Sequence, residues 1–134
     1  MRKVILSGAV FLLTGCPGPM DPVRLELPAQ ATLVNNKICI LVPAEAGERI
    51  FSVQIGSEAG QEMLRTFGDP ASQPRAVKGE CLPTYAFEFK PGNSYAAYYS
   101  LEKSATEKGR LFAARFTLFQ DADGKLKILQ QTQR

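Results

Sequence analysis

The side chains with the clearest chemical potential in this chain are its three cysteines, Cys16, Cys39 and Cys81. A thiol can form a thioether or a disulfide, so the surroundings of each cysteine decide which bond to expect. Cys16 follows a basic start and an apolar run, whereas Cys39 and Cys81 lie among segments of alternating apolar and polar residues. We therefore expect Cys16 to have a chemistry different from that of the other two.

The surroundings of Cys16 predict covalent lipidation. Two basic residues, Arg2 and Lys3, follow the initiating methionine, and residues 4–13 are mostly apolar, an outline typical of secretory signals. This run is too short for a membrane-spanning helix, which needs about 20 residues. The box Leu13-Thr14-Gly15-Cys16 resembles the lipobox of bacterial lipoproteins. That resemblance implies a diacylglycerol on the Cys16 thiol, cleavage before Cys16 and acylation of the new amine; an ordinary signal peptide is the alternative.

Lipidation would set both the location and the domain boundaries. Two or more acyl chains anchor a protein stably, whereas one does so only marginally. In bacterial lipoproteins an aspartate after the cysteine often signals retention at the inner membrane, and here the residue is Pro17. We therefore expect the protein to be anchored at the periplasmic face of the outer membrane. The expected organisation is a signal peptide at 1–15, a lipidated cysteine and flexible tether at 16–30, and one domain at 31–134.

Cys39 and Cys81 are then the two cysteines left in an oxidising compartment, where such a pair is expected to bridge. A bridge between them would close a loop of about 43 residues and would add roughly 4 kcal/mol to the free energy of unfolding by the chain-entropy account. Two free thiols are the alternative.

Charge and composition argue against several function classes. Loss of Arg2 and Lys3 with the signal would reduce the formal net charge of +3 by two, so we expect no nucleic-acid partner. The chain has no histidine, which removes the commonest general base and metal ligand at neutral pH. It also lacks a nucleophile elbow and a phosphate loop. Glu58 and Glu62 are interpreted as solvated surface acids. We therefore expect no enzyme, no cofactor and no small-molecule substrate.

One short segment is weakly similar to a calcium loop. Asp121 and Asp123 precede Gly124, but Lys125 and Lys127 occupy later positions where oxygen ligands are required. We therefore predict a polar hairpin turn and no metal site.

Hydrophobic periodicity predicts an all-β fold. Short runs alternate or are β-branched, and turn residues separate them about every ten positions, a pattern typical of a sandwich of about seven strands. The predicted strands are residues 37–42, 48–56, 62–67, 82–89, 94–101, 111–119 and 125–130, with a short apolar run at 31–35. An edge strand within 23–27 and a helix at 57–67 are the alternatives left open.

The tyrosines follow this alternation. Tyr95 and Tyr99 should lie on one face of their strand and Tyr98 on the other, where an exposed ring could anchor a partner. We expect that ring to pack on the strand with its hydroxyl at the rim, and the partner contact is the alternative.

One motif resembles the fibronectin type III pattern. Residues 89–95 (FKPGNSY) place Pro91 and Gly92 in a turn before Tyr95. The resemblance implies an immunoglobulin-like or fibronectin type III-like β-sandwich in which the Tyr95 hydroxyl bonds nearby backbone. Cys81 precedes Tyr95, whereas the second cysteine of antibody domains follows that tyrosine. The bridge should instead tie the 37–42 strand to the start of the 82–89 strand.

Taken whole, the chain resembles a family of small enterobacterial lipoproteins described as periplasmic immunity proteins of type VI secretion systems. The residues that carry the resemblance are 12–19 (LLTGCPGP), 37–40 (KICI), 79–83 (GECLP), 89–95 (FKPGNSY) and 112–116 (FAARF). The resemblance implies a protein that binds and neutralises an effector toxin delivered into the periplasm by a sibling cell. A structural or adaptor lipoprotein of the outer envelope is the alternative.

The expected contact surface consists of three polar loops, at residues 43–49, 68–80 and 102–110. Long polar loops on a rigid sandwich commonly carry recognition. Within the third loop the candidate partner-binding residues are Glu102, Lys103, Lys108 and Arg110.

Overall fold

The computed structural model describes residues 25–104 and 107–131. Within these ranges the chain forms an all-β sandwich of two sheets, with eight strands and one short 3-10 turn. The strands are β1 (Glu26–Pro28), β2 (Gln30–Val34), β3 (Lys37–Leu41), β4 (Arg49–Ser57), β5 (Glu62–Thr66), β6 (Asn93–Glu102), β7 (Arg110–Gln120) and β8 (Leu126–Gln130), and the 3-10 turn is η1 (Pro70–Ser72). The expected all-β sandwich is confirmed.

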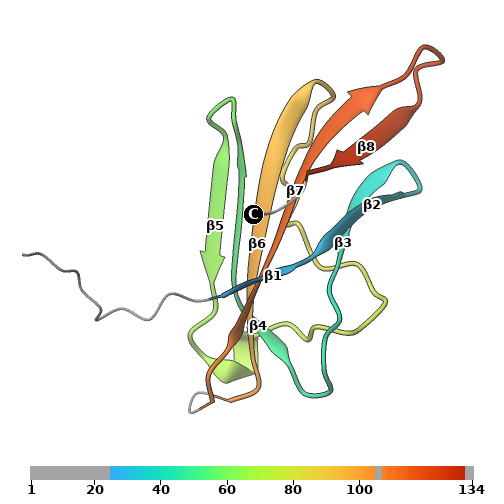
Figure 1. The fold of residues 1–134 in the computed structure, drawn as a ribbon. Coiled ribbons are helices and arrows are strands. Elements are labelled where there is room, and N and C mark those ends of the chain that lie inside the picture. Colours follow the sequence, from blue (N-terminus) through green and yellow to red (C-terminus); the bar gives the residue numbers. More distant parts are fainter. Residues whose placement is uncertain (1–24, 105–106, 132–134) are drawn as a thin grey trace, which may run out of the picture.

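The larger sheet has the strand order β1-β7-β6-β4-β5, and β8 also pairs with β7 (Figure 1). β1 runs parallel to β7, and all the other neighbours are antiparallel. β1 pairs with the first part of β7 and β8 with the last part, so the two strands share one edge. β5 forms the opposite edge.

The second layer is built from the β2–β3 hairpin and the irregular chain before β6. Asn35 and Asn36 both have positive φ angles, of 53° and 63°, which suits a two-residue hairpin turn. Leu82 forms an antiparallel bridge with Ile40 of β3 and widens this layer. β2 contacts β7 and β8, and Figure 1 shows the hairpin set apart from the strands of the larger sheet.

Alternating residues of the central strands fill the space between the layers. The largest fully buried side chains include Tyr99, Phe112, Phe116 and Ile40. Tyr95 and Tyr99 point into this core, and Tyr98, which is partly exposed, points to the other face. The alternation predicted for this strand is therefore confirmed.

The Pro91-Gly92 turn and Tyr95 have the arrangement that the fibronectin-like motif implied. Gly92 has a φ of 96°, a region that glycine enters without steric cost, and its N–H donates to Leu118. The Tyr95 hydroxyl accepts a hydrogen bond from the Lys90 N–H at 2.6 Å and lies 3.2 Å from the Lys90 carbonyl, to which it can donate. This contact fastens the chain entering β6 to the core.

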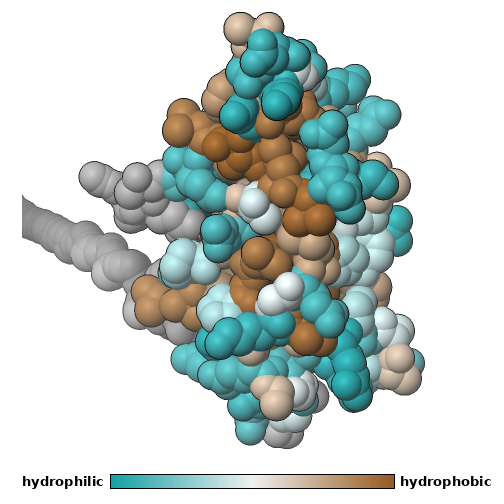
Figure 2. Space-filling model, turned by 90° about the vertical axis from the view of Figure 1, so that its right-hand side faces the viewer, coloured by the Kyte–Doolittle hydropathy of each residue, from teal (hydrophilic) through white to brown (hydrophobic). Residues whose placement is uncertain are grey.

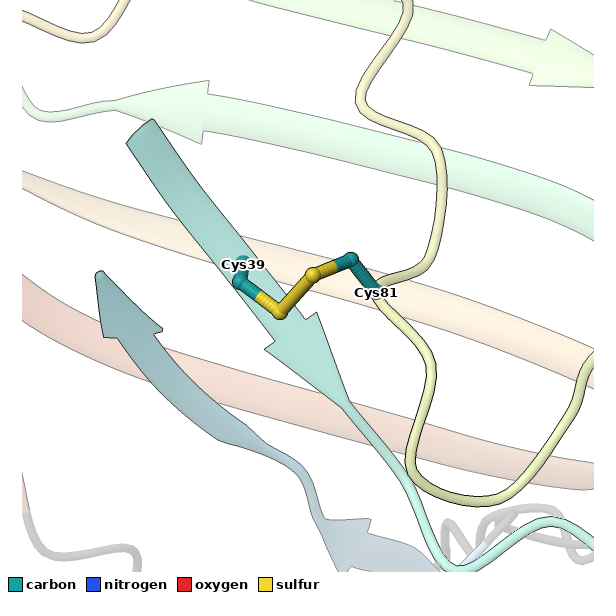
Figure 3. Close-up of a disulfide and its surroundings, with 2 residues drawn as sticks. All are labelled: Cys39 and Cys81. Carbon is teal, nitrogen blue, oxygen red and sulfur yellow. A yellow bond between two sulfur atoms is a disulfide. The ribbon is translucent and has the colours of Figure 1, made fainter. Parts of the chain in front are cut away.

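Cys39 and Cys81 form a disulfide, with their Cα atoms 5.0 Å apart. Figure 3 shows the bridge passing from β3 to the loop that carries Cys81. Cys39 is buried, whereas Cys81 is exposed. We call residues 67–92, between β5 and β6, the long crossing loop. The bridge fixes this loop to β3.

The strand predicted at 82–89 is wrong. Tyr85 and Ala86 have positive φ angles, of 51° and 60°, and the Phe87 N–H donates to Thr84, so the chain makes a tight turn. The Tyr99 hydroxyl donates to the Pro83 carbonyl at 2.8 Å and holds the start of this turn over β6. The aromatic residues of the segment still pack on the core, which is why their spacing imitated a strand.

Two boundaries also differ from expectation. The folded unit includes β1, so the segment expected to be a tether at 16–30 contributes a strand from Glu26 onward. The edge strand left open within 23–27 is confirmed in part, because β1 covers Glu26–Pro28 and pairs with β7. The helix considered at 57–67 is absent, because residues 62–66 form β5 against β4.

Candidate functional site

The first two predicted contact loops join at one end of the sandwich. Arg49 and Arg75 form an isolated antiparallel bridge. On either side of it, the Ile50 N–H donates to the Pro74 backbone carbonyl at 2.8 Å and the Ala76 N–H donates to the Glu48 backbone carbonyl at 3.1 Å. The 68–80 loop thus adds a short strand-like segment beside the beginning of β4.

Side chains attach the third loop to the same end. Lys103 forms an ion pair with Glu45 at 3.0 Å, and the Gln73 amide donates to Glu102 at 3.3 Å. We call the surface formed by residues 43–49, 68–80, 102–104 and 107–110 the loop end. All three loops proposed from the sequence therefore contribute to one contiguous surface.

A buried carboxylate connects the loop end to the large sheet. The Glu48 side chain is only 3% exposed, and Arg110 donates to its two oxygens at 2.9 and 2.6 Å. Burial alone would raise the pKa of Glu48. The hydrogen bonds from Arg110 and the Glu45 backbone, with the charges of Arg110 and Lys103, outweigh burial and hold that pKa below its ordinary value of 4.5.

The four candidate contact residues therefore differ in their tasks. Arg110 stabilises Glu48, and its guanidinium also lies over the Phe112 ring. Lys103 and Glu102 take part in contacts between loops, whereas Lys108 is exposed to solvent. Reversing all four charges together would disturb the fold as well as any contact surface, so single changes are needed.

A groove of about 410 Å³ crosses the loop end. Its lining contains three cations, Arg49, Arg75 and Lys78, beside the apolar Ala76 and Val77; the other lining residues are Ala44, Glu45, Ala46, Gly47 and Glu48. We call it the cationic groove, because both of its acids are already paired with Lys103 or Arg110. Sequence reasoning missed this feature, since it arises from a bridge between a loop and a strand.

A second groove of about 420 Å³ lies between the tips of the β2–β3 and β7–β8 hairpins and the turn at 84–87. Its apolar lining is Leu33, Ile38, Phe87, Phe89, Leu118 and Leu126. Figure 2 shows a band of apolar side chains running down the corresponding side of the molecule between polar margins. No local sequence pattern predicts this groove, because its walls come from three separate hairpins or turns.

The outer face of the large sheet carries a shallow polar hollow of about 390 Å³. Glu58 and Glu62 line it together with Tyr98 and Arg115. The Arg115 guanidinium donates to the Tyr98 hydroxyl at 3.0 Å and pairs with Glu26 at 3.1 Å. Tyr98 is thus the tyrosine that faces solvent, and it is held by a neighbouring strand.

The segment weakly similar to a calcium loop, at residues 121–124, forms the turn between β7 and β8. Asp121 accepts hydrogen bonds from the backbone of Asp123 and Lys125, both at 2.9 Å, so its carboxylate closes the β7–β8 turn.

Within residues 25–104 and 107–131 there is no cluster of three or more potential metal-ligating His, Cys, Asp or Glu side chains. The described part of the chain also contains no helix with the length and apolar character needed to cross a bilayer. Cys16 and the signal segment lie outside the described residues.

Comparison with known proteins gives one family. Residues 26–121 match a domain of unknown function, DUF7480. Neither the curated proteins nor the solved structures contain a match. The matched region runs from β1 through β7 to the start of the last turn, and it includes the disulfide, the loop end and the Tyr95 turn. The chain therefore belongs to the DUF7480 family.

Proposed function

We propose that this protein is a lipid-anchored binding protein of the bacterial periplasm that neutralises a type VI secretion effector by direct protein–protein contact. The observation that carries the proposal is the convergence of three polar loops into the loop end, on a sandwich stapled by Cys39–Cys81. Loops held on a rigid scaffold are the usual location of recognition residues.

The frame suits an inhibitor that works by steric contact. Ion pairs and backbone hydrogen bonds join the three loops to each other, so their contact groups are arranged before a partner arrives. Such preorganisation lowers the entropy lost on binding. A disulfide suits an oxidising compartment such as the bacterial periplasm.

The lipid anchor supports the same function. Acylation of Cys16 would hold the domain at the membrane surface, where a toxin entering the periplasm must pass. The first strand begins at Glu26, so a short segment of the sequence would separate the lipid from the folded domain. Anchoring would raise the local concentration of inhibitor without any additional contact.

A co-culture tests this function. The gene is deleted from a strain, and the mutant is mixed with its parent, whose type VI system is active. We expect selective killing of the mutant, and rescue by the restored gene. A version without residues 1–15, which stays in the cytoplasm, should fail to rescue although it is expressed at an equal level.

Two controls make the result decisive. The secretion system of the parent must be shown to kill an unrelated competitor, and the mutant must carry no second copy of the gene. Equal survival of mutant and parent under those conditions would contradict the immunity function and favour the adaptor lipoprotein. The adaptor would instead co-purify with an envelope assembly in cells that lack the secretion system.

A further inference from the structure

We propose that the cationic groove binds an acidic segment of the partner protein, with carboxylates placed against Arg49, Arg75 and Lys78. This inference rests on the proposed function and assigns the contact chemistry within the loop end.

Arg49 and Arg75 face each other at the closest kind of cross-strand position. The two hydrogen bonds beside the bridge, from Ile50 to Pro74 and from Ala76 to Glu48, join the residues that flank the pair. The two arginines are therefore a non-hydrogen-bonded antiparallel pair, in which Cα atoms are about 4.5 Å apart. Like charges directly opposite each other in this geometry destabilise the pairing.

The described structure does not neutralise these charges. Arg49 donates one hydrogen bond to the Pro70 carbonyl at 3.2 Å, which carries no formal charge. Among residues 25–104 and 107–131, neither arginine forms an ion pair, and neither does Lys78. The acids of the same groove, Glu45 and Glu48, are occupied by Lys103 and Arg110. The groove thus presents three cations without a counter-charge.

An acidic protein segment fits this groove better than a phosphate polymer does. A guanidinium can bind a carboxylate through two parallel hydrogen bonds, and Arg49 and Arg75 offer two such groups side by side. Ala76 and the exposed Val77 supply an apolar wall for the intervening side chains of a peptide. A phosphate backbone carries no apolar side chain to place against that wall.

The probe for this inference is a labelled synthetic peptide of alternating glutamate and alanine, compared with its glutamine-alanine counterpart. Binding to the purified full chain is measured by fluorescence anisotropy at low ionic strength, because surface charge contacts are screened by salt. We expect the glutamate peptide to bind and the glutamine peptide to bind at least about fivefold more weakly, since surface ion pairs contribute only modestly.

A pair of charge-matched variants locates the site. R49Q/R75Q/K78Q should weaken binding of the glutamate peptide at least about fivefold, while K37Q/K90Q/K125Q should weaken it less than about twofold. Each variant removes three positive charges from exposed or partly exposed positions, and only the first alters the groove. Unchanged thermal unfolding shows that both variants are folded.

Three results would overturn the inference. The first is the absence of glutamate-peptide binding up to about 1 mM. The second is equal weakening by the two triple variants, which would indicate general charge attraction. The third is displacement of the peptide by inorganic phosphate at a lower concentration than by free glutamate, which would make the groove a phosphate site.

Co-culture separates this inference from the proposed function. If the restored wild-type gene protects and R49Q/R75Q/K78Q protects equally well, the immunity function stands and the groove is not its contact site. If the wild-type gene does not protect, the immunity function fails whatever the peptide does.

Discussion

The carboxylate of Glu48 lies in a two-point ion pair with the guanidinium of Arg110, with nitrogen–oxygen distances of 2.9 and 2.6 Å. The partners are 62 residues apart in the sequence and join the 43–49 loop to the first residue of β7. A pair formed across this distance fixes the loop end relative to the large sheet. Its loss should therefore change both stability and the geometry of the proposed contact surface.

Replacement of Arg110 by glutamine should destabilise the protein by roughly 2 to 3 kcal/mol. A fully buried pair costs about 3 to 5 kcal/mol to break, and the 29% exposure of the Arg110 side chain reduces that figure. Glu48→Gln should cost less, because a neutral amide still accepts from the Glu45 N–H and the charge left behind, on Arg110, is partly exposed and lies 3.9 Å from Glu45. Urea unfolding of both variants measures this order, with Lys108→Gln as the exposed control; a larger loss for Glu48→Gln would contradict it.

Acid should weaken the fold through the same carboxylate. Because the pKa of Glu48 in the folded chain lies below 4.5, its contribution to stability is complete above that pH. The contribution is lost as the pH falls through the lowered folded-state value, where the carboxylate becomes protonated. The urea midpoint, followed from about pH 6 to about pH 3, should fall more steeply in the wild type than in Glu48→Gln. Parallel curves would show that Glu48 is not responsible.

Removal of the Tyr95 hydroxyl should loosen the turn before β6. Tyr95→Phe leaves the Lys90 N–H without its 2.6 Å acceptor, and we expect a loss of about 1 kcal/mol because water reaches part of this site. Tyr98→Phe is the matched control, since its hydroxyl accepts from Arg115 on the outer face. That variant should lose less than about half as much free energy of unfolding. Equal losses in urea unfolding would argue against a special role for the Tyr95 turn.

The sequence predicted those strands whose side chains repeat with a period of two. In β6, Tyr95 and Tyr99 enter the core and Tyr98 does not, because the second layer covers only one face of the large sheet. The same criterion failed at 82–89, where three partly buried aromatics also alternate. There Tyr85 and Ala86 adopt positive φ angles that no periodic pattern can reveal.

The candidate site was predictable in its location and not in its contacts. Long polar loops are visible in the sequence, and all three meet at one end of the sandwich. The partners of Glu48 and Glu45 depend on how β7 returns beside β6, which local composition does not encode. The pairing of Arg49 with Arg75 depends likewise on the position of the long crossing loop, which the disulfide and the Ile40–Leu82 bridge hold against β3.

Reduction of the Cys39–Cys81 bridge should weaken the long crossing loop more than the large sheet. The cysteines are 42 residues apart, so chain entropy predicts a loss of up to roughly 4 kcal/mol, a large share of the 5 to 15 kcal/mol typical of domains. The pairings of β6 with β4 and with β7 do not involve the chain between β5 and β6, whereas the Arg49–Arg75 bridge of the loop end does. Hydrogen exchange of Cys39→Ala/Cys81→Ala should therefore rise first at Ala76 and Leu82 and last in β6. The double variant avoids the free exposed thiol that Cys39→Ala alone would leave at Cys81. Uniform acceleration across all strands would mean that the bridge stabilises the sandwich as a whole, and the loop end would then have no separate dependence on it.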